Sequence, residues 1–382
     1  MRILITTGGW KSALTCMRSF AKAGHDVYLI TSDEFTPARF SKFCKGWYLS
    51  PEERDREGYI DFLVNLIRKN SFDILIPISD RCLEYVSELR EQLSPYIRFL
   101  IPSKHCVEIA RNKDKTYHFA VEHGISMPQT FFPRTLKEVE GIARRISFPC
   151  VVKEPKGTGG SGNSYPRNRK ELLQVFLRYA ERQLQWPFVQ EYINGQFCGF
   201  TAVCNKGNAL NPFMFQVLRQ YPASGGVTVY ARSMRDQAMF DQCTELIRAL
   251  DWTGPIDLDL FVTDKGRFVL LEINPRFSGA TQFAYRCGVD LPQSLLGVMD
   301  GNGNKPLQPK YQTGILYRSV FCEEIESCFD RPSYFFDFLK NSFQTRVKTD
   351  IDLADTQLFL WQLKSAKWCV SKRWASRAAA AN

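Results

Sequence analysis

The stretch LLEINPRFSGA, residues 270–280, is the most informative segment of the sequence. Its apolar start predicts a buried strand over residues 268–273, and the Asn-Pro pair that follows predicts a turn. Glu272 and Asn274 are two residues apart, so their side chains lie on the same face of an extended chain. Arg276 adds a cation directly after them. The segment therefore presents two oxygen ligands and a positive charge on one surface.

A second predicted strand precedes this segment. It covers residues 256–262 and carries Asp257 and Asp259, and a turn over residues 263–266 joins the two strands into a hairpin. The hairpin gathers two or three carboxylates, a carboxamide and an arginine. Mg²⁺ prefers such oxygen ligands and is usually shared with nucleotide phosphates. The alternative is the charged face of an ordinary hairpin, although Glu and Asn are disfavoured at the end of an apolar strand unless they have partners.

Composition bounds the class of protein. The chain has 382 residues, 44% of them apolar, which predicts a globular protein of two or three domains. No apolar run is long enough to span a bilayer, and residues 1–6 predict a strand rather than a signal peptide. Twelve cysteines without a C-x-x-C pair argue against zinc or disulfides and for a cytoplasmic protein. The net charge of +10 fits an anionic ligand, and no nucleic acid is expected.

Helices and strands alternate over the first hundred residues. The predicted strands are 3–6, 27–30, 74–78 and 97–101, and the predicted helices are 11–23, 60–69 and 81–92. This alternation predicts a small doubly wound parallel sheet over residues 1–102, with ligands at the carboxyl ends of its strands. Those ends hold Gly8, Gly9, Ser32, Asp33, Ser79 and Asp80. The glycine pair has the spacing of neither a P-loop nor a dinucleotide-binding motif.

Two lysines and a glycine-rich loop mark the middle of the chain. A helix is predicted over residues 114–123, with Lys115 near its start, and a buried strand within residues 148–155 carries Lys153 near its end. The loop that follows contains Gly157, Gly159, Gly160, Ser161 and Gly162. Backbone N–H groups of such a loop can fold around phosphate oxygens. A flexible linker has a similar composition, but the lysine just upstream favours phosphate binding.

Two further segments carry candidate binding groups. Residues 188–195 predict a strand that continues into a turn, where exposed peptide groups could hydrogen-bond an adenine edge. A second loop of small residues begins with a cation, and it contains Arg219, Ser224 and Gly225. A helix over residues 240–250 then leads to the hairpin.

Taken in order, these motifs resemble those of the ATP-grasp superfamily. They are a lysine that opens a helix, a V-V-K strand, a glycine-rich loop, a Q-E-Y-I hinge and E-x-N-P-R. The run E-I-N-P-R-F-S-G-A looks like the carbamoyl-phosphate-synthetase-like branch, with D-aspartate ligases as distant relatives. The resemblance implies a mixed α/β and α+β chain: a pre-ATP-grasp doubly wound sheet over residues 1–102, a two-lobed ATP-grasp domain over residues 103–300, and a C-terminal extension over residues 301–382.

The resemblance also implies nucleotide-binding residues. The phosphates of ATP would contact Lys115 and Lys153, with the loop from Gly157 to Gly162 closing over them. The adenine would be held by Glu191 and by the backbone of Tyr192 and Ile193. Phe197 departs from the family pattern, because that position usually holds a glutamate that grips the ribose.

Metal and catalytic residues follow from the same resemblance. Two Mg²⁺ ions, for which Mn²⁺ can substitute, would be held by Asp259, Glu272 and Asn274. Asp259 is preferred to Asp257 because it lies thirteen residues before Glu272, with the hairpin turn midway. The catalytic groups would be Arg276, Arg219, Ser224 and Gly225, which would steady the charge that develops on the reacting oxygens.

Together these parts imply an ATP-dependent carboxylate–amine ligase with small-molecule substrates. The carboxylate would be activated as an acyl phosphate, and an amine would then displace phosphate. A dinucleotide-dependent oxidoreductase is an alternative, but it lacks the glycine fingerprint and leaves the hairpin unexplained. A non-catalytic nucleotide sensor or a basic binding module is another. No oligomeric state follows from the sequence, although a dimer is compatible with it.

The end of the chain is basic and rich in tryptophan. Residues 358–377 predict an amphipathic stretch with Trp361, Trp368 and Trp374 between lysines and arginines. Two interpretations stay open. The stretch is either a terminal helix docked on the body of the protein or a peripheral contact with an anionic membrane surface.

Overall fold

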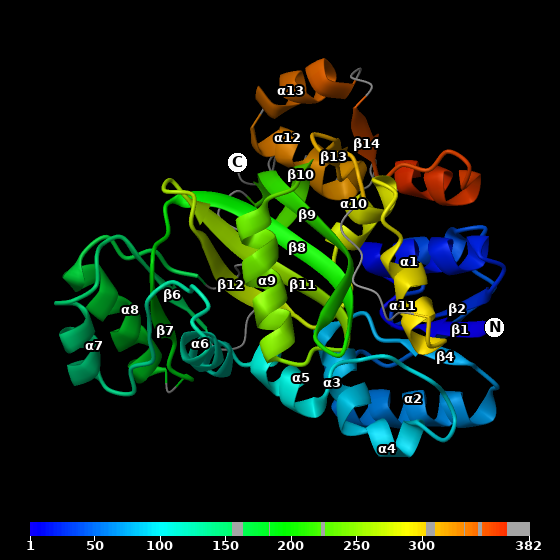
Figure 1. The fold of residues 1–382 in the computed structure, drawn as a ribbon, viewed down its shortest axis with the longest axis horizontal. Coiled ribbons are helices and arrows are strands. Elements are labelled where there is room, and N and C mark those ends of the chain that lie inside the picture. The colour runs from blue at the N-terminus through cyan, green and yellow to red at the C-terminus, as the bar shows by residue number, and fades with distance from the viewer. Residues whose placement is uncertain are drawn as a thin grey trace, which may run out of the picture.

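The computed structural model describes residues 1–154, 163–182, 184–222, 226–302, 310–331, 333–342 and 346–364. Within these ranges the chain forms three β-sheets with helices packed on them (Figure 1). In this part of the chain, no helix is both long enough and apolar enough to cross a membrane.

The N-terminal sheet is parallel and doubly wound, as predicted. Its strands are β3 (Gly46–Leu49), β2 (Asp26–Thr31), β1 (Arg2–Ile5) and β4 (Ile74–Ile76), in that order. Successive side chains of a strand point to opposite faces. Ile3 and Ile5 therefore pack with α1 (Lys11–Lys22), while Leu4 packs with α2 (Arg56–Lys69). Figure 1 shows α1 and α2 on opposite sides of this sheet.

Two predictions for this region were wrong, and one strand was missed. Residues 97–101 do not form a strand: Arg98 makes one isolated bridge to Ile74, and Pro102 soon follows without an N–H to extend the ladder. The edge strand β3 was not predicted, because it is short and only partly buried. The helix predicted over residues 81–92 is two helices, α3 (Asp80–Glu88) and α4 (Arg90–Leu93), which meet at Leu89.

A small lobe follows the N-terminal sheet. Helices α5 (Lys104–Arg111) and α6 (Lys113–Glu122) lead into a three-stranded antiparallel sheet. Its strands are β5 (Thr130–Phe131), β7 (Phe188–Glu191) and β6 (Cys150–Lys153), in that order. Helices α7 (Leu136–Ile142) and α8 (Arg169–Glu181) share an apolar core with this sheet, in which Val139, Phe176 and Val189 are fully buried.

The largest sheet has seven strands and forms the second lobe. In order they are β12 (Phe268–Asn274), β11 (Gly254–Thr263), β8 (Gly195–Asn205), β9 (Asn208–Tyr221), β10 (Val227–Met234), β13 (Leu316–Arg318) and β14 (Val347–Thr349). The predicted hairpin is the antiparallel pair β11–β12 at one edge. Helix α9 (Gln237–Ala249) shares the core on one face. Helices α10 (Ala280–Arg286) and α11 (Leu291–Met299) share the core on the other face with α1.

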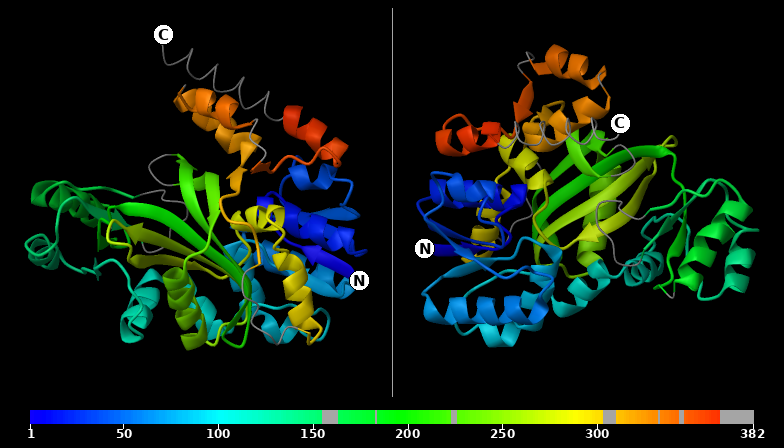
Figure 2. Two further views of the ribbon diagram at one scale, coloured as in Figure 1. Left: turned by 45° about the horizontal axis from the view of Figure 1, so that its top comes forward. Right: turned by 180° about the vertical axis from the view of Figure 1, so that it is seen from behind.

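The C-terminal segment contacts both the large sheet and the N-terminal region. Strand β13 extends the sheet beside β10, and β14 pairs with β13; helices α12 (Ile325–Asp330) and α13 (Ser333–Ser342) lie between these two strands in sequence. Figure 2 shows the end of the described chain beside the N-terminal sheet. The division into residues 1–102, 103–300 and 301–382 remains a prediction, and the large sheet takes strands from both of the last two parts.

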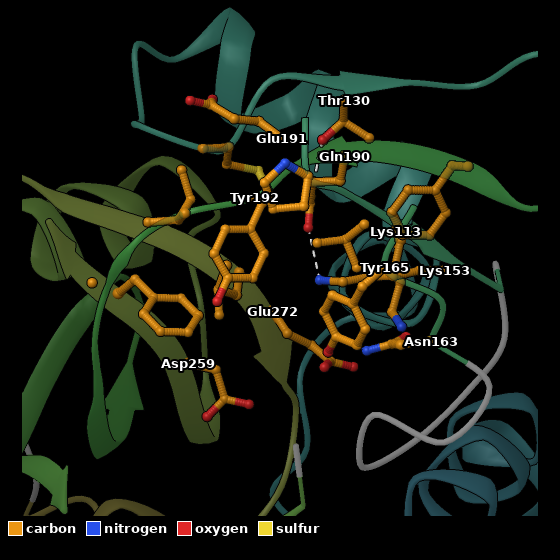
Figure 3. A pocket seen from close by; sticks show the side chains of 18 of the residues that line it. Lys113, Thr130, Lys153, Asn163, Tyr165, Gln190, Glu191, Tyr192, Asp259 and Glu272 are labelled. Atoms are coloured by element: carbon orange, nitrogen blue, oxygen red, sulfur yellow. Dashed lines mark hydrogen bonds between the residues drawn. The ribbon is translucent and has the colours of Figure 1, made fainter. Parts of the chain in front are cut away.

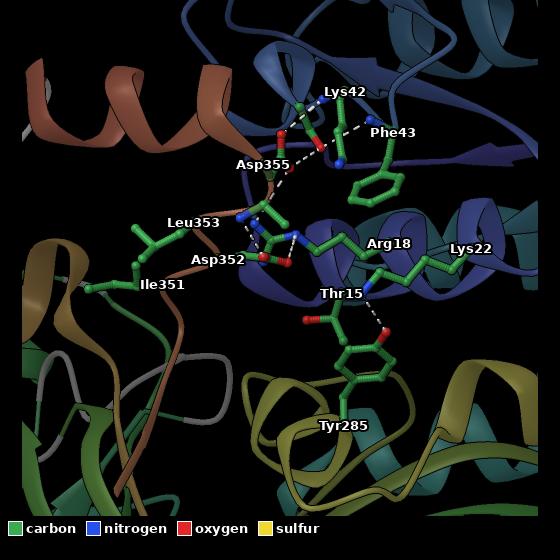
Figure 4. A network of polar contacts seen from close by, with 12 residues as sticks. Thr15, Arg18, Lys22, Lys42, Phe43, Tyr285, Ile351, Asp352, Leu353 and Asp355 are labelled. Atoms are coloured by element: carbon green, nitrogen blue, oxygen red, sulfur yellow. Dashed lines mark hydrogen bonds and ion pairs between the residues drawn. The ribbon is translucent and has the colours of Figure 1, made fainter.

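A buried carboxylate anchors this segment (Figure 4). Asp355 accepts hydrogen bonds from the Ser41 hydroxyl and from the Lys42 N–H at 3.0 Å, and it lies 3.6 Å from Nη2 of Arg18. Beyond it, Leu358 is fully buried and the Trp361 ring stacks on Phe40, with centroids 5.6 Å apart. The first part of the predicted amphipathic stretch thus docks on the protein, while residues 365–377 lie outside the described residues.

Candidate functional site

A cavity of about 950 Å³ lies between the small lobe and the large sheet. Its walls come from β6, β7, β8, β11 and β12 and from the start of α6. Figure 3 shows Lys113 of α6 and Lys153 of β6 in its wall, together with the carboxylates Asp259 and Glu272 of the hairpin. Glu191 of β7 also lines the cavity, as do Glu154 and Arg167.

Lys153 is held in place at the end of β6. Its Nζ donates to Oε1 of Gln190 at 2.7 Å, and the Gln190 amide in turn donates to the Thr130 hydroxyl at 2.9 Å. The pKa of Lys153 is lowered to about 8, mainly by burial and also by nearby Lys113, whereas Glu272 acts in the opposite direction. A desolvated, fixed ammonium gains strongly from an anionic ligand, because phosphate oxygens restore the hydrogen bonds lost from water.

The hairpin register brings the predicted metal ligands together. Asp259 lies directly opposite Glu272, and Asp257 lies opposite Asn274. The amide of Asn274 donates to Oδ2 of Asp259 at 3.4 Å. Burial raises the pKa of Asp259 well above its usual value, and the neighbouring carboxylates Asp257 and Glu272 raise it further. Clustered carboxylates of this kind are stabilised in the charged form by a cation.

The donor set fits a magnesium ion that is shared with phosphate. In the described ranges, no group of three or more His, Cys, Asp or Glu side chains could hold a metal ion on its own. Asp259 and Glu272 both line the cavity, so the protein offers two carboxylates there. Mg²⁺ usually takes one or two carboxylates and completes its shell with water and substrate phosphates. Oδ1 of Asp257 is also buried, with no hydrogen-bond partner among the described residues.

Arg276 lies beside the hairpin and reaches the N-terminal region. Its Nε donates to Oδ1 of Asp80 at 2.7 Å, and its Nη2 lies 3.3 Å from Oδ2 of the same carboxylate. Nη2 also lies 3.4 Å from Oδ1 of Asn274. The Trp10 ring centroid is 4.8 Å from the centre of the guanidinium group. Arg276 is therefore oriented by groups from the first eighty residues.

Three predicted cations, Lys115, Arg219 and Arg276, are not among the residues that line the cavity. Lys115 extends away and pairs with Glu108 at 3.0 Å, while Lys113 lines the cavity instead. Residues two positions apart on a helix do not share a face, and the sequence did not show which of the two faces inward. Arg219 is buried: its Nη1 lies 3.5 Å from Glu324 and its guanidinium stacks on Tyr334 at 3.9 Å.

Several of the predicted site residues lie outside the described ranges. They are Gly157, Gly159, Gly160, Ser161 and Gly162 of the first loop and Ser224 and Gly225 of the second.

The predicted adenine-binding hinge does line the cavity. Glu191, Tyr192 and Ile193 are all part of its wall. The Glu191 carboxylate accepts from the Gln129 N–H at 3.2 Å, which ties the hinge to the strand next to it. Phe197 also lines the cavity and packs edge-on against Phe261, with ring centroids 5.6 Å apart. The position that departs from the family pattern is thus an apolar wall.

Sequence reasoning missed three supporting residues. Gln190 was visible in the Q-E-Y-I motif, where it alternates with Glu191 and therefore points to the other face of β7. Thr130 is on a two-residue strand without a local pattern. Asp80 was identified only as a residue at a strand end, because nothing local links it to Arg276, 196 residues later.

Comparisons with known proteins agree with this geometry. Residues 110–280 match the family model of the ATP-grasp domain. The chain is 23% identical over 292 residues to the carbamoyl phosphate synthase large chain of Thermotoga neapolitana, a match that covers 72% of this chain and 26% of that protein. The chain thus spans about a quarter of the length of that relative.

Solved structures show the same fold. The biotin carboxylase domain of Hydrogenobacter thermophilus 2-oxoglutarate carboxylase, solved with MgADP and bicarbonate, superposes with a TM-score of 0.69 at 15% identity, covering 82% of this chain and 73% of that one. An L-amino acid ligase from Bacillus licheniformis gives a TM-score of 0.61 at 19% identity, covering 80% and 75%. At these identities the likeness establishes the fold.

Proposed function

We propose that this chain, which carries an ATP-grasp domain, is an ATP-dependent carboxylate–amine ligase. One observation carries the proposal: a single cavity between the two lobes places Lys113 and Lys153 on one side and Asp259 and Glu272 on the other. Lysine ammonium groups bind phosphate oxygens and Mg²⁺ takes carboxylate oxygens, so this combination suits a triphosphate with Mg²⁺. The fold shared with an L-amino acid ligase and a biotin carboxylase supports ligase chemistry.

The residues divide into a nucleotide group and a metal group. Lys113 and Lys153 contact the phosphates, and Glu191 with the backbone of the two residues after it holds the adenine. Asp259, Glu272 and Asn274 hold Mg²⁺, which would neutralise charge on the phosphates when bound. Two ions, or Mn²⁺ in their place, are compatible with these oxygen ligands. The predicted phosphate loop, from Gly157 to Gly162, lies outside the described residues.

The reaction joins an acid to an amine. An oxygen of the acid attacks the γ-phosphorus of ATP, so that an acyl phosphate and ADP form. The amine nitrogen then attacks the acyl carbon, phosphate leaves with the C–O bonding electrons, and the amine gives up a proton. Arg276 lies next to the hairpin and donates to the oxygen that becomes negative. Fixed donors of this kind contribute mainly by positioning and electrostatics.

A substrate screen tests the proposal. The purified chain is given Mg²⁺ and ATP with pairs of amino acids and amino sugars, ADP release is recorded, and product mass is measured for active pairs. We expect ADP release that needs both an acid and an amine, together with a product lighter than their sum by one water. Mg-ATP binding by calorimetry without stimulation by any pair would favour a nucleotide sensor instead. A chain that binds no nucleotide would contradict the proposal altogether.

The state of the cysteines bears on the compartment. We propose a reducing environment such as the cytoplasm, because the cysteines whose side chains are described are free thiols and most of them are buried.

A further inference from the structure

A chain of polar contacts connects the N-terminal sheet with the metal-ligand hairpin. It begins at Asp80, continues through Arg276 and Asn274, and ends at Asp259. The first contact is bidentate, at 2.7 and 3.3 Å, and the next two are 3.4 Å each. The strong contact is therefore the one between Asp80 and Arg276, and it joins residues that are 196 positions apart.

Asp80 is well placed to fix a guanidinium group. It is the first residue of α3, directly after the carboxyl end of β4, and only 5% of it is exposed. Both of its oxygens accept from Arg276. Arg111, which also pairs with Glu84, lies 3.3 Å from Oδ2 and supports the carboxylate from another side. A carboxylate held in this way offers a rigid edge to the planar arginine fork.

Trp10 restricts the same guanidinium from a second direction. Cζ of Arg276 lies over its ring, 4.8 Å from the centroid, while Asp80 holds one edge of the guanidinium group. Trp10 comes from the loop between β1 and α1, at the same end of the parallel sheet as Asp80. The contacts with Asp80 and with the Trp10 ring together restrict rotation of the Arg276 guanidinium group. The remaining contacts of the group, to Asn274 and to the Phe277 carbonyl at 3.5 Å, are too long to fix it alone.

We propose that Asp80 is a positioning residue that, with Trp10, sets the orientation of Arg276 for the reaction. The inference deepens the proposed function and rests on it for its catalytic consequence. The N-terminal sheet would then do more than flank the site, because it would hold the cation that meets the reacting oxygens. A misplacement of about 1 Å in a positioned group costs up to about 100-fold in rate.

The orientation itself can be measured without any substrate. In protein labelled with ¹⁵N-arginine, the Arg276 Nε–H signal is assigned by its loss in Arg276→Lys. We expect a slowly exchanging signal in the native chain and a shifted, faster-exchanging one in Asp80→Ala. Asp80→Asn, which keeps the side-chain shape, should show the same change and serves if the alanine variant fails to fold. An unchanged signal in the folded variant would overturn the proposal.

A control variant separates this role from the loss of any carboxylate. Glu88→Gln alters the same helix α3 and removes an exposed partner of Arg56. It should leave the Arg276 signal and turnover unchanged. A change in the Arg276 signal equal to that in Asp80→Asn would mean that the effect is general to α3, and the proposal would fail.

Kinetics then test the consequence for the reaction. With the most active acid–amine pair from the substrate screen, Asp80→Asn should lower kcat by about 10- to 100-fold and leave the KM for ATP nearly unchanged. Combined with Arg276→Ala, it should cause no further loss, since the two residues act through one group. A full additional loss would overturn the proposal. Failure of the proposed function gives a different result: an inactive native chain whose Arg276 signal still responds to Asp80.

Discussion

The protonation state of Lys153 should depend on whether a nucleotide is bound. In the ligand-free protein, burial lowers the pKa of this lysine to about 8, so an increasing fraction is neutral as the pH rises above 8. Bound phosphates favour the charged form and raise the pKa again. We therefore expect Mg-ATP binding near pH 8 to take up a proton, and the affinity to fall as the pH rises from 8 to 9.5.

Calorimetry in buffers of different ionisation enthalpy measures this uptake. Lys153→Met should remove it and weaken binding by about 1.5–3 kcal/mol. Lys137, which is exposed on α7, provides the control, and Lys137→Met should bind as the native chain does. Equal proton uptake by Lys153→Met would show that another group titrates.

Replacing Glu272 by Gln should have different effects on the stability of the ligand-free protein and on turnover. It lies opposite Asp259, whose pKa is raised by burial and by neighbouring carboxylates, so the two repel each other without a cation. Glu272→Gln removes that repulsion. The melting temperature without ligand should stay the same or rise, whereas the increase caused by Mg-ATP should shrink. Turnover should fall by about 100-fold or more.

Thermal shift assays with and without Mg-ATP, beside ADP release, check both halves of this prediction. Glu245→Gln, on the exposed side of α9, is the matched control and should change neither quantity. A Glu272→Gln variant that keeps the full Mg-ATP stabilisation and normal turnover would place the metal elsewhere.

At the scale of one element, helix α6 places Lys113 and Lys115 in different surroundings. The sequence alone did not show which of the two contacts the phosphates. Lys113 lines the cavity, whereas Lys115 pairs with Glu108 outside it. Lys113→Ala should weaken Mg-ATP binding by about tenfold or more, in line with the loss of a charged hydrogen bond. Lys115→Ala should have almost no effect, because an exposed ion pair contributes little. Calorimetry measures the dissociation constant of Mg-ATP for each variant. A larger loss of affinity in Lys115→Ala than in Lys113→Ala would identify Lys115 as the phosphate ligand.

Local patterns explain which elements could be predicted. The β11–β12 hairpin follows from alternating side chains around a four-residue turn. The pairing of Asp259 with Glu272 also depends on an irregularity of the ladder between Asp259 and Leu260, which the alternation does not encode. Strand β3 and the failed strand at residues 97–101 depend on what lies beside them, which periodicity does not encode. The Asp80–Arg276 contact is beyond any local pattern, since the fold alone brings the two residues together.

At the scale of the whole molecule, Asp355 should be one of the most sensitive positions. It is fully buried, and it accepts from Ser41 and Lys42 while it faces the buried Arg18. Removing one partner of a buried ion pair costs about 3–5 kcal/mol, and without Asp355 the buried Arg18 keeps only Asp352, whose Oδ2 lies 3.8 Å from its Nε. Asp355→Ala should lose stability on that scale in urea denaturation.

The surface pair of Asp26 and Lys45 gives the comparison for this prediction. Both side chains are more than half exposed and 3.6 Å apart, so Asp26→Ala should cost about 1 kcal/mol or less. Equal losses in the two variants would show that the C-terminal segment is not anchored through Asp355.

The core that joins Ile3 to Leu358 has a consequence for how the chain is made. A ribosome delivers the N-terminal sheet first, yet one side of α1 packs against α10 and α11, which are translated much later. Until those helices and Leu358 emerge, the nascent protein exposes apolar surface that only its own distant end can cover. Growing chains that expose such surface are prone to aggregate. We therefore expect the growing chain to be prone to aggregation until α10, α11 and Leu358 have been made, because the apolar side of α1 is covered only then.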